Sequence, residues 1–198
     1  MILLPIIFLI AFLYAAVGFG GATGYLAVMS LFDIEPQIMA STALLLNVVV
    51  ASISFIIYFR AGHLHRDLLL PFILASVPAA FVGGSIKLNE EIYSILLYVV
   101  LTFVAIRLLF FSRQMEDETA SRDPRLASRV PPPFWPALLI GILIGLLSGM
   151  LGIGGGVFLS PVILYSGWGN SRQAAAVSAA FIVLNSISGL LGRITSGT

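Results

Sequence analysis

The sequence predicts an all-α protein: a polytopic bundle of transmembrane helices. Hydrophobic residues make up 59% of the 198 residues and charged residues only 10%, whereas about a quarter of the residues of a soluble domain are charged. The charges are also clustered, so that long stretches contain none of them. A helix needs roughly 20 apolar residues to cross the hydrocarbon core of a bilayer. We therefore expect a multi-pass protein of the cell membrane, with the lipid bilayer as its main partner.

Six apolar segments succeed one another along the chain. Charge and a proline that suits a helix start occur at 33–36, and short charged turns occur at 60–67 and 87–91. Residues 112–133 mix acids, arginines and prolines, and they are expected to form a polar linker in the cytoplasm. The expected spans are about 2–32, 36–59, 68–87, 91–111, 134–168 and 172–192.

The distribution of cations predicts how the bundle sits in the membrane. With six alternating crossings, the turns after the second and fourth spans share a side with both chain ends. That side receives eight of the ten lysine and arginine residues, and the other side receives Lys87 and Arg172. Because cytoplasmic loops carry an excess of Lys and Arg, we expect both termini, the N-terminus included, in the cytoplasm.

The chain partly matches itself at a shift of 134 residues. Gly18-Phe-Gly-Gly21 aligns with Gly152-Ile-Gly-Gly155, and Ser-Ile-Ser at 52–54 aligns with Ser-Ile-Ser at 186–188. Apolar sequences match each other by chance, but the glycine pattern and the serine pair are harder to dismiss. The matches therefore predict two related repeats.

The first repeat, 1–111, would hold four spans, and the second, 134–198, only two. Because four is an even number, both copies would cross the membrane in the same sense, as parallel repeats related by an axis along the membrane normal. The second repeat is incomplete relative to the first. We expect a truncated chain, a truncated gene, or two chains that complete each other as a homo-oligomer.

Two glycine runs, 18–24 and 149–156, lie inside segments that are too long for one straight crossing. Each glycine in a helix costs about 1 kcal/mol relative to alanine, and unpaired backbone at membrane depth persists only inside protein or along a wet cavity. A helix that restarts there would present free N–H groups and a positive dipole end to an anion. The alternative is close helix packing through small residues, whose four-residue spacing recurs at Gly20 and Gly24, Gly141 and Gly145, and Gly152 and Gly156.

Neutral polar residues also occur inside the spans, whereas no ionisable residue lies in the middle of one. A buried amide or hydroxyl either lines a solute pathway or bonds to a neighbouring helix, and both interpretations stay open. At the repeat shift, Asn47 aligns with position 181, one helical turn from Asn185. The candidate substrate-binding residues are Gly18, Gly20, Gly21, Thr23, Thr42, Asn47, Gly152, Gly154, Gly155, Gly156, Ser178 and Asn185.

Other classes of function find little support in the sequence. A net charge of +1 argues against a nucleic-acid partner. The chain has no cysteine, and His63 and His65 lack a third ligand, so no metal or other cofactor is expected. No catalytic motif occurs, and the carboxylates lie in loops rather than facing each other. We therefore do not expect an enzyme and name no catalytic residue.

Further motifs surround the glycine runs: Ala16-Val-Gly-Phe-Gly-Gly21, Arg60-Ala-Gly-His-Leu64 followed by Pro71 and Val82-Gly-Gly84, and Leu147-Ser-Gly-Met-Leu-Gly-Ile-Gly-Gly-Gly156 with Pro161. Over nearly the whole chain, the sequence resembles the sulfite exporter TauE/SafE family. The resemblance implies about eight spans in two related halves, and a plasma-membrane permease for small sulfur-containing anions. It places the family's glycine motif on both runs. Ala22 takes the place of the third glycine in the first copy, and the family's last two spans are absent.

Together these observations predict a permease that moves a small anion, a sulfur oxyanion or organosulfonate, across the cytoplasmic membrane. Backbone amides at the two glycine breaks would bind the anion, and movement of one unit against the other would alternate access. The alternative is a non-transporting helical subunit that assembles with a membrane partner or stabilises it. The missing spans favour that alternative.

Overall fold

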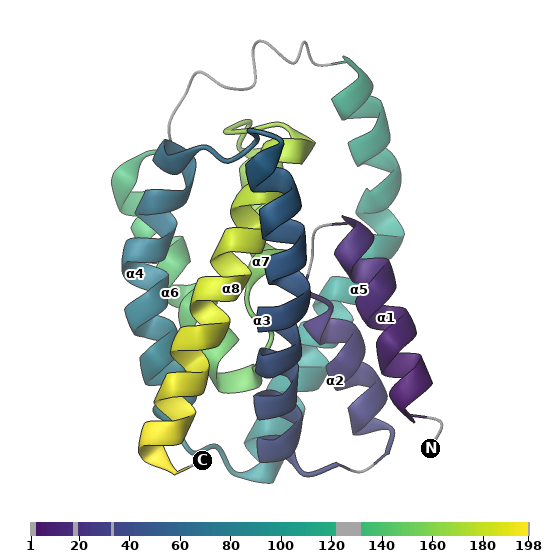
Figure 1. Ribbon diagram of the computed structural model, residues 1–198, viewed down its shortest axis with the longest axis vertical. Coiled ribbons are helices and arrows are strands. Elements are labelled where there is room, and N and C mark those ends of the chain that lie inside the picture. Colours follow the sequence, from purple (N-terminus) through teal and green to yellow (C-terminus); the bar gives the residue numbers. More distant parts are fainter. Residues whose placement is uncertain (1–2, 18–19, 33, 122–131, 198) are drawn as a thin grey trace.

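The computed structural model describes residues 3–17, 20–32, 34–121 and 132–197, and all regular elements within these ranges are α-helices. The predicted all-helical fold class is confirmed for these residues. The helices form an elongated bundle (Figure 1). They are α1 (Leu3–Val17), α2 (Ala22–Ser30), α3 (Pro36–Arg60), α4 (Arg66–Ser85), α5 (Glu90–Ser121), α6 (Phe134–Leu151), α7 (Gly156–Tyr165) and α8 (Ser171–Ser196).

Four of these helices, α3, α4, α6 and α8, are long and apolar enough to cross a membrane. Side chains on the outside of the bundle are often large and apolar: Val49 and Leu143, for example, are 61% and 64% exposed. Water would penalise such a surface, whereas lipid tails solvate it. The transmembrane bundle predicted from composition therefore agrees with the arrangement of the side chains.

The first apolar segment, 2–32, is not one interrupted crossing but a hairpin of two short helices. α1 rises from the N-terminal end of the bundle and α2 descends toward the same end (Figure 1). The Tyr14 and Thr23 hydroxyls lie 3.3 Å apart, and a Cβ added to Gly24 would meet Ile10 at 2.6 Å. Such cross-contacts require the second helix to run back along the first. The prediction of a single crossing is wrong here.

The segment 134–168 folds back in the same way. α6 descends and α7 returns upward (Figure 1), and a Cβ at Gly155 would lie 2.6 Å from Ile144. The physical reason is the backbone of the break: glycines with positive φ reverse the chain, whereas the prediction assumed that the helix would restart in line.

Because each hairpin returns to the end of the bundle from which it started, the orientation of the second half of the chain relative to the first differs from the predicted one. Each half has two helices joined by a glycine break and then a long helix, but α3 ascends and α8 descends (Figure 1). Only α3, α4 and α5 run from end to end before α6 begins, and an odd number of crossings inverts the second unit relative to the first. The predicted parallel orientation is therefore wrong: the two units run in opposite directions, as in inverted-topology transporters. That they are related repeats stays a prediction.

The chain termini and the α3–α4 turn lie at opposite ends of the bundle, whereas the sequence predicted them on the same side. Both chain termini lie at the end that holds the α4–α5 turn (Figure 1), where Lys87 Nζ donates a hydrogen bond to the Gly197 carbonyl at 3.5 Å. The α3–α4 turn lies at the opposite end, where His65 Nε2 and Gln173 Nε2 lie 2.8 Å apart. The prediction placed both termini on the cation-rich side because it assumed six crossings, and that premise is wrong. α5 also continues to Ser121, ten residues into the stretch expected as linker.

Glycines bring α4, α6 and α8 into close contact at the centre of the bundle. A Cβ at Gly141 would meet the Phe72 carbonyl oxygen at 2.6 Å, and one at Gly145 or Gly149 would collide with the backbone of α4 in the same way. On α8, Ser188 Oγ donates to the Val77 carbonyl of α4 at 2.6 Å. We call this contact, formed by Gly141, Gly145 and Gly149 against α4, the glycine seam. The packing interpretation of small residues holds there.

Candidate functional site at the two helix breaks

Both glycine breaks adopt backbone that favours glycine. Gly21 has φ of +82°, and Gly152, Gly154 and Gly155 have φ of +82°, +76° and +82°. α2 and α7 begin directly after these residues, and neither start has a side-chain cap. The first N–H groups of a helix have no acceptor within the helix and form the positive end of its dipole. Each break therefore ends in a set of oriented donors.

The two breaks meet at one side chain, Asn47 of α3. A Cβ at Gly154 would lie 2.7 Å from Asn47 Nδ2, and a Cβ at Gly20 would collide with Asn47 Oδ1. Ile182 Cγ2 of α8 would lie 3.0 Å from a Cβ at Gly20 of the first break and 2.9 Å from a Cβ at Gly154 of the second. Ser186 Oγ is 3.2 Å from the Cβ position of Gly154. Four segments far apart in the sequence thus converge.

Polar atoms at this meeting point have no partner in the part of the chain that the structure describes. They are the amide nitrogen and oxygen of Asn47 and Ser186 Oγ, in residues that are fully buried, and the two amide atoms of the buried Asn185 on α8 have no partner either. Asn185 lies one helical turn from Ile182 and beside Ser186. Each such group costs about 1–3 kcal/mol when it stays unbonded. These are the groups that a polar solute would bind.

The other polar residues of the predicted site lie away from Asn47 or bond to neighbouring helices. Thr23 bonds to Tyr14 within the first hairpin, and Ser178 Oγ lies 3.0 Å from Ser160 Oγ, joining α8 to α7. Thr42 is half-buried on the face of α3 that also presents the exposed Ile38 and Leu45. Thr42 is therefore not brought to the breaks.

Of the predicted glycines, some lie at the meeting point and others pack elsewhere. Gly20 and Gly154 lie against Asn47, and Gly156 packs on Ile182. Gly152 lies against the Ala40 backbone, and a Cβ at Gly155 would meet Ile144 and Phe181. Gly21 shapes the start of α2. Gly18 lies outside the described residues.

Sequence reasoning missed Ser186 and Ile182 as part of the meeting point. Ser186 belongs to the Ser-Ile-Ser match that supported the repeat, so a signal was present but was used only for alignment. Ile182 carries no signal that distinguishes it from other apolar residues of its segment.

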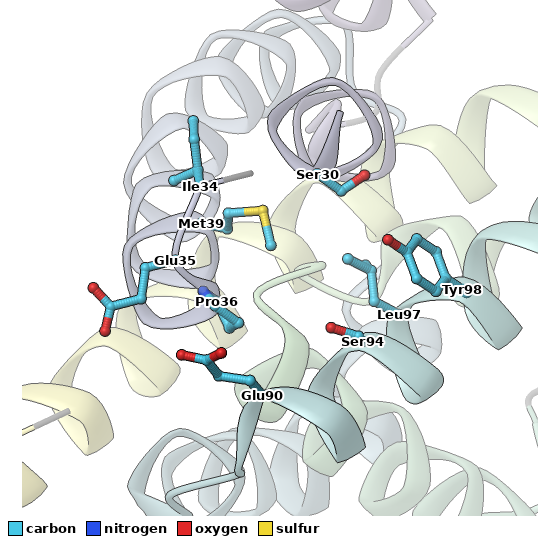
Figure 2. Close-up of a pocket in the computed structure, with 9 residues that line it drawn as sticks. All are labelled: Ser30, Ile34, Glu35, Pro36, Met39, Glu90, Ser94, Leu97 and Tyr98. Atoms are coloured by element: carbon cyan, nitrogen blue, oxygen red, sulfur yellow. The ribbon is translucent and has the colours of Figure 1, made fainter. Parts of the chain in front are cut away.

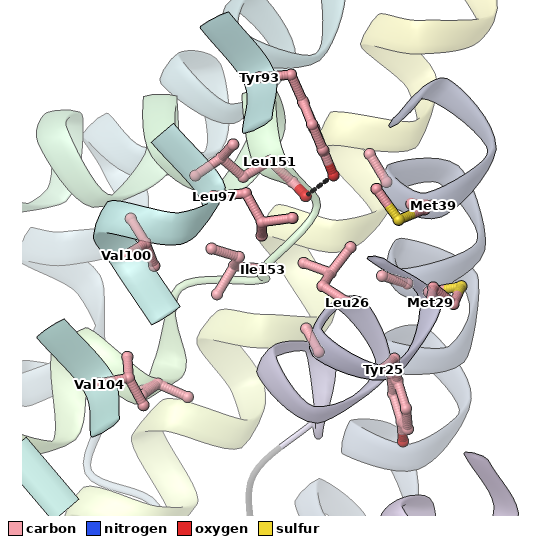
Figure 3. Close-up of a cluster of buried hydrophobic side chains, with 14 residues drawn as sticks. Tyr25, Leu26, Met29, Met39, Tyr93, Leu97, Val100, Val104, Leu151 and Ile153 are labelled. Carbon is pink, nitrogen blue, oxygen red and sulfur yellow. Dashed lines mark hydrogen bonds between the residues drawn. The ribbon is translucent and has the colours of Figure 1, made fainter. Parts of the chain in front are cut away.

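Sequence reasoning also missed a set of hydrogen bonds at the end of α6. Arg193 Nη2 donates to the carbonyls of Met150 at 2.7 Å and Gly149 at 3.3 Å. The Tyr93 hydroxyl donates to the Leu151 carbonyl at 3.1 Å (Figure 3). The carbonyl end of a helix is the negative end of its dipole, which a cation stabilises. Arg193 therefore holds the tip of the second hairpin in place.

A separate pocket of about 360 Å³ lies at the end of the bundle that holds the termini, between α2, α3 and α5 (Figure 2). Glu35 and Glu90 both line it. Two carboxylates repel an anion. Over the described residues, no group of three His, Cys, Asp or Glu could hold a metal ion. The breaks, with their helix starts and unpartnered amides, therefore suit an anion better than this pocket does.

Two probable membrane transporter proteins are similar to this chain in sequence. A probable membrane transporter protein of Sinorhizobium fredii is 38% identical to this chain over 191 residues, which are 96% of this chain and 74% of the relative. A probable membrane transporter protein of Methanocaldococcus jannaschii is 23% identical over all of this chain and 75% of its own length. No solved structure matches the chain significantly.

The sequence profile described as sulfite exporter TauE/SafE matches residues 3–198, which includes both glycine breaks and Asn47. That match confirms the resemblance noted from the motifs, and the names of the relatives support membrane transport. The chain belongs to the sulfite exporter TauE/SafE family of membrane proteins.

Proposed function

We propose that the chain is a cell-membrane permease for a small anion, with sulfite, sulfonates and related organosulfur anions as its substrate class. One observation supports this most: two helix starts, at Gly21 and Gly155, follow breaks that both lie against the unpartnered amide of Asn47. The family name supplies the sulfur-containing substrate class.

The donors at the breaks suit an anion on physical grounds. A helix start stabilises a nearby anion by about 0.3–1 kcal/mol at a surface, and by up to about 2 kcal/mol where it is partly buried. Asn47, Asn185 and Ser186 add neutral donors close by. A site made of neutral donors can bind an anion and still release it, because no fixed cation has to be separated from it.

The opposite directions of the two units support alternating access. The first hairpin enters the bundle from the end that holds the termini, and the second enters from the other end (Figure 1). Movement of each hairpin would therefore open the shared site toward a different side. This replaces the movement of two four-span units that the sequence suggested.

The cations support a revised orientation. Arg60, Arg66 and Arg172 lie in or beside turns at the end opposite the termini. The positive-inside rule assigns that end to the cytoplasm, so both termini would lie outside. Labelling of a single cysteine introduced at Asn89, in the α4–α5 turn, tests this. A membrane-impermeant thiol reagent should modify it in intact cells, and protection there would reverse the orientation.

Flux of sulfite and methanesulfonate into proteoliposomes tests the function itself. The change Asn47→Asp keeps the size of the side chain but places a like charge at the anion, which costs several kcal/mol. We expect flux to fall by about a hundredfold or more. The matched change Asn89→Asp, at an exposed residue that caps α5 through Ile92 N, should leave flux unchanged because Asp also caps helices.

Two outcomes would count against the proposal. Flux that survives Asn47→Asp would remove the anion from the breaks. A well-folded wild-type chain that moves no anion of this class would favour the alternative, a non-transporting helical subunit.

A further inference from the structure

The amides at the meeting point offer hydrogen-bond acceptors as well as donors. An asparagine side chain has two N–H donors and one oxygen with two lone pairs. In Asn47 and in Asn185, both the nitrogen and the oxygen are buried and have no partner among the described residues.

Apart from the backbone N–H groups at the breaks, which the proposed anion occupies, the surroundings supply few protons for these oxygens. Ile182, which touches the positions beside both breaks, is apolar. Ser186 carries one hydroxyl proton, so it can satisfy at most one of the two amide oxygens. An anion that has only acceptor atoms would bind the Nδ2 groups and the backbone N–H groups, but it would leave at least one buried oxygen without a donor.

We infer that the preferred solute carries a hydrogen-bond donor in addition to its negative charge: a protonated oxyanion, or a sulfonate with a hydroxyl group. The inference rests on the proposed function, since it assumes an anion at this site. For sulfite, it assigns the singly protonated form. A sulfonate donates through its hydroxyl group to Asn47 Oδ1 or Asn185 Oδ1 and accepts from the breaks through its oxygens.

Two sulfonates form a matched pair for the test. 2-Hydroxyethanesulfonate and ethanesulfonate have the same charge and nearly the same size, and they differ by one hydroxyl donor. Sites built to bind a substrate hydroxyl discriminate strongly against the analogue that lacks it, because a buried polar group then stays unpaired. We expect 2-hydroxyethanesulfonate to inhibit uptake of labelled sulfite at a concentration about tenfold lower or more.

The change Asn47→Leu sharpens the test. It removes one of the two acceptor oxygens and keeps the number and branching of the heavy side-chain atoms, so the preference between the two sulfonates should shrink severalfold. The change Asn89→Ser keeps the cap of α5 and should retain the full preference. Ligand-induced shifts of the melting temperature in detergent give the same comparison without flux, so a variant that does not transport still reports binding.

The outcomes separate this inference from the proposed function. Equal inhibition by the two sulfonates in the wild-type protein, in uptake and in melting temperature, would overturn the donor requirement and leave the permease intact. Binding of neither sulfonate nor of sulfite would overturn both. Because the wild-type comparison decides the matter, the result does not depend on whether Asn47→Leu folds.

Discussion

The glycine seam and the second glycine break lie next to each other on one segment, yet they use glycine for opposite purposes. At the seam, Gly145 and Gly149 are ordinary helical residues whose missing side chains admit the backbone of α4. At the break, Gly154 has φ of +76° and lies against the side chains of Asn47 and Ile182. The seam holds helices together, and the break reverses the chain and brings its backbone to buried amides. One residue type thus serves packing in one place and a site in the other.

The seam should respond most strongly to substitution. A side chain at Gly149 would meet Gly84 N at 2.6 Å and the Ala80 carbonyl carbon at 2.9 Å, both backbone atoms that cannot turn aside. We expect Gly149→Val to lower the free energy of unfolding by about 3 kcal/mol or more, seen as loss of the monodisperse protein in detergent. At Gly62, nothing lies within 4 Å, so Gly62→Ala should cost only about 1 kcal/mol of backbone strain.

A substitution at the break should lower the stability less than one at the seam, and it should weaken anion binding more. Gly154→Ala forces a residue with a side chain into left-handed backbone, at about 1–2 kcal/mol, and pushes on the Asn47 amide. We expect a correspondingly modest fall in thermal stability, together with loss of most of the anion-dependent melting shift. A variant that loses stability as Gly149→Val does, while the surviving protein binds normally, would show that the break is only another packing contact.

Asn47→Leu should stabilise the protein by about 1 kcal/mol, because it replaces an unbonded buried amide by an apolar group of similar shape. Urea or thermal unfolding of the purified variant measures this, and sulfite uptake should be lost at the same time. A decrease in stability would mean that the amide already has a partner in the resting protein, and it would weaken the assignment of the site.

The smallest effect is expected at the border between seam and break. Tyr93→Phe removes the hydrogen bond to the Leu151 carbonyl and should cost about 1 kcal/mol. Tyr98→Phe, on the exposed side of the same helix, should cost nothing measurable. If the two changes have equal effects on the melting temperature, the bond at the tip of α6 contributes no stability.

Composition and periodicity were sufficient to predict the helical bundle, both glycine breaks and Asn47 as a candidate. They were insufficient for the direction of the chain. An apolar run of about thirty residues accommodates either one interrupted crossing or two short antiparallel helices. The choice depends on the φ angles of residues such as Gly154, which spacing does not encode. Each hairpin was counted as one crossing. This miscount gave the wrong relative orientation of the two units, and it also put the termini at the wrong end of the bundle.

The side-chain assignments show a second limit. Thr42 and Asn47 are polar residues of one helix, five positions apart, and the sequence offered no reason to separate them. In the bundle Asn47 faces α8 and the breaks, whereas Thr42 shares a face with exposed apolar residues. Which face is inside depends on the neighbouring helices, whose placement the sequence alone did not provide.

The hydrogen bonds of Arg193 and Tyr93 to the last carbonyls of α6 have a mechanical consequence. They fasten the tip of the second hairpin to α5 and α8, while the glycine seam fastens the rest of α6 to α4, so that α6 is held along its length. A swing that begins at the turn would have to break those bonds together, which makes it abrupt.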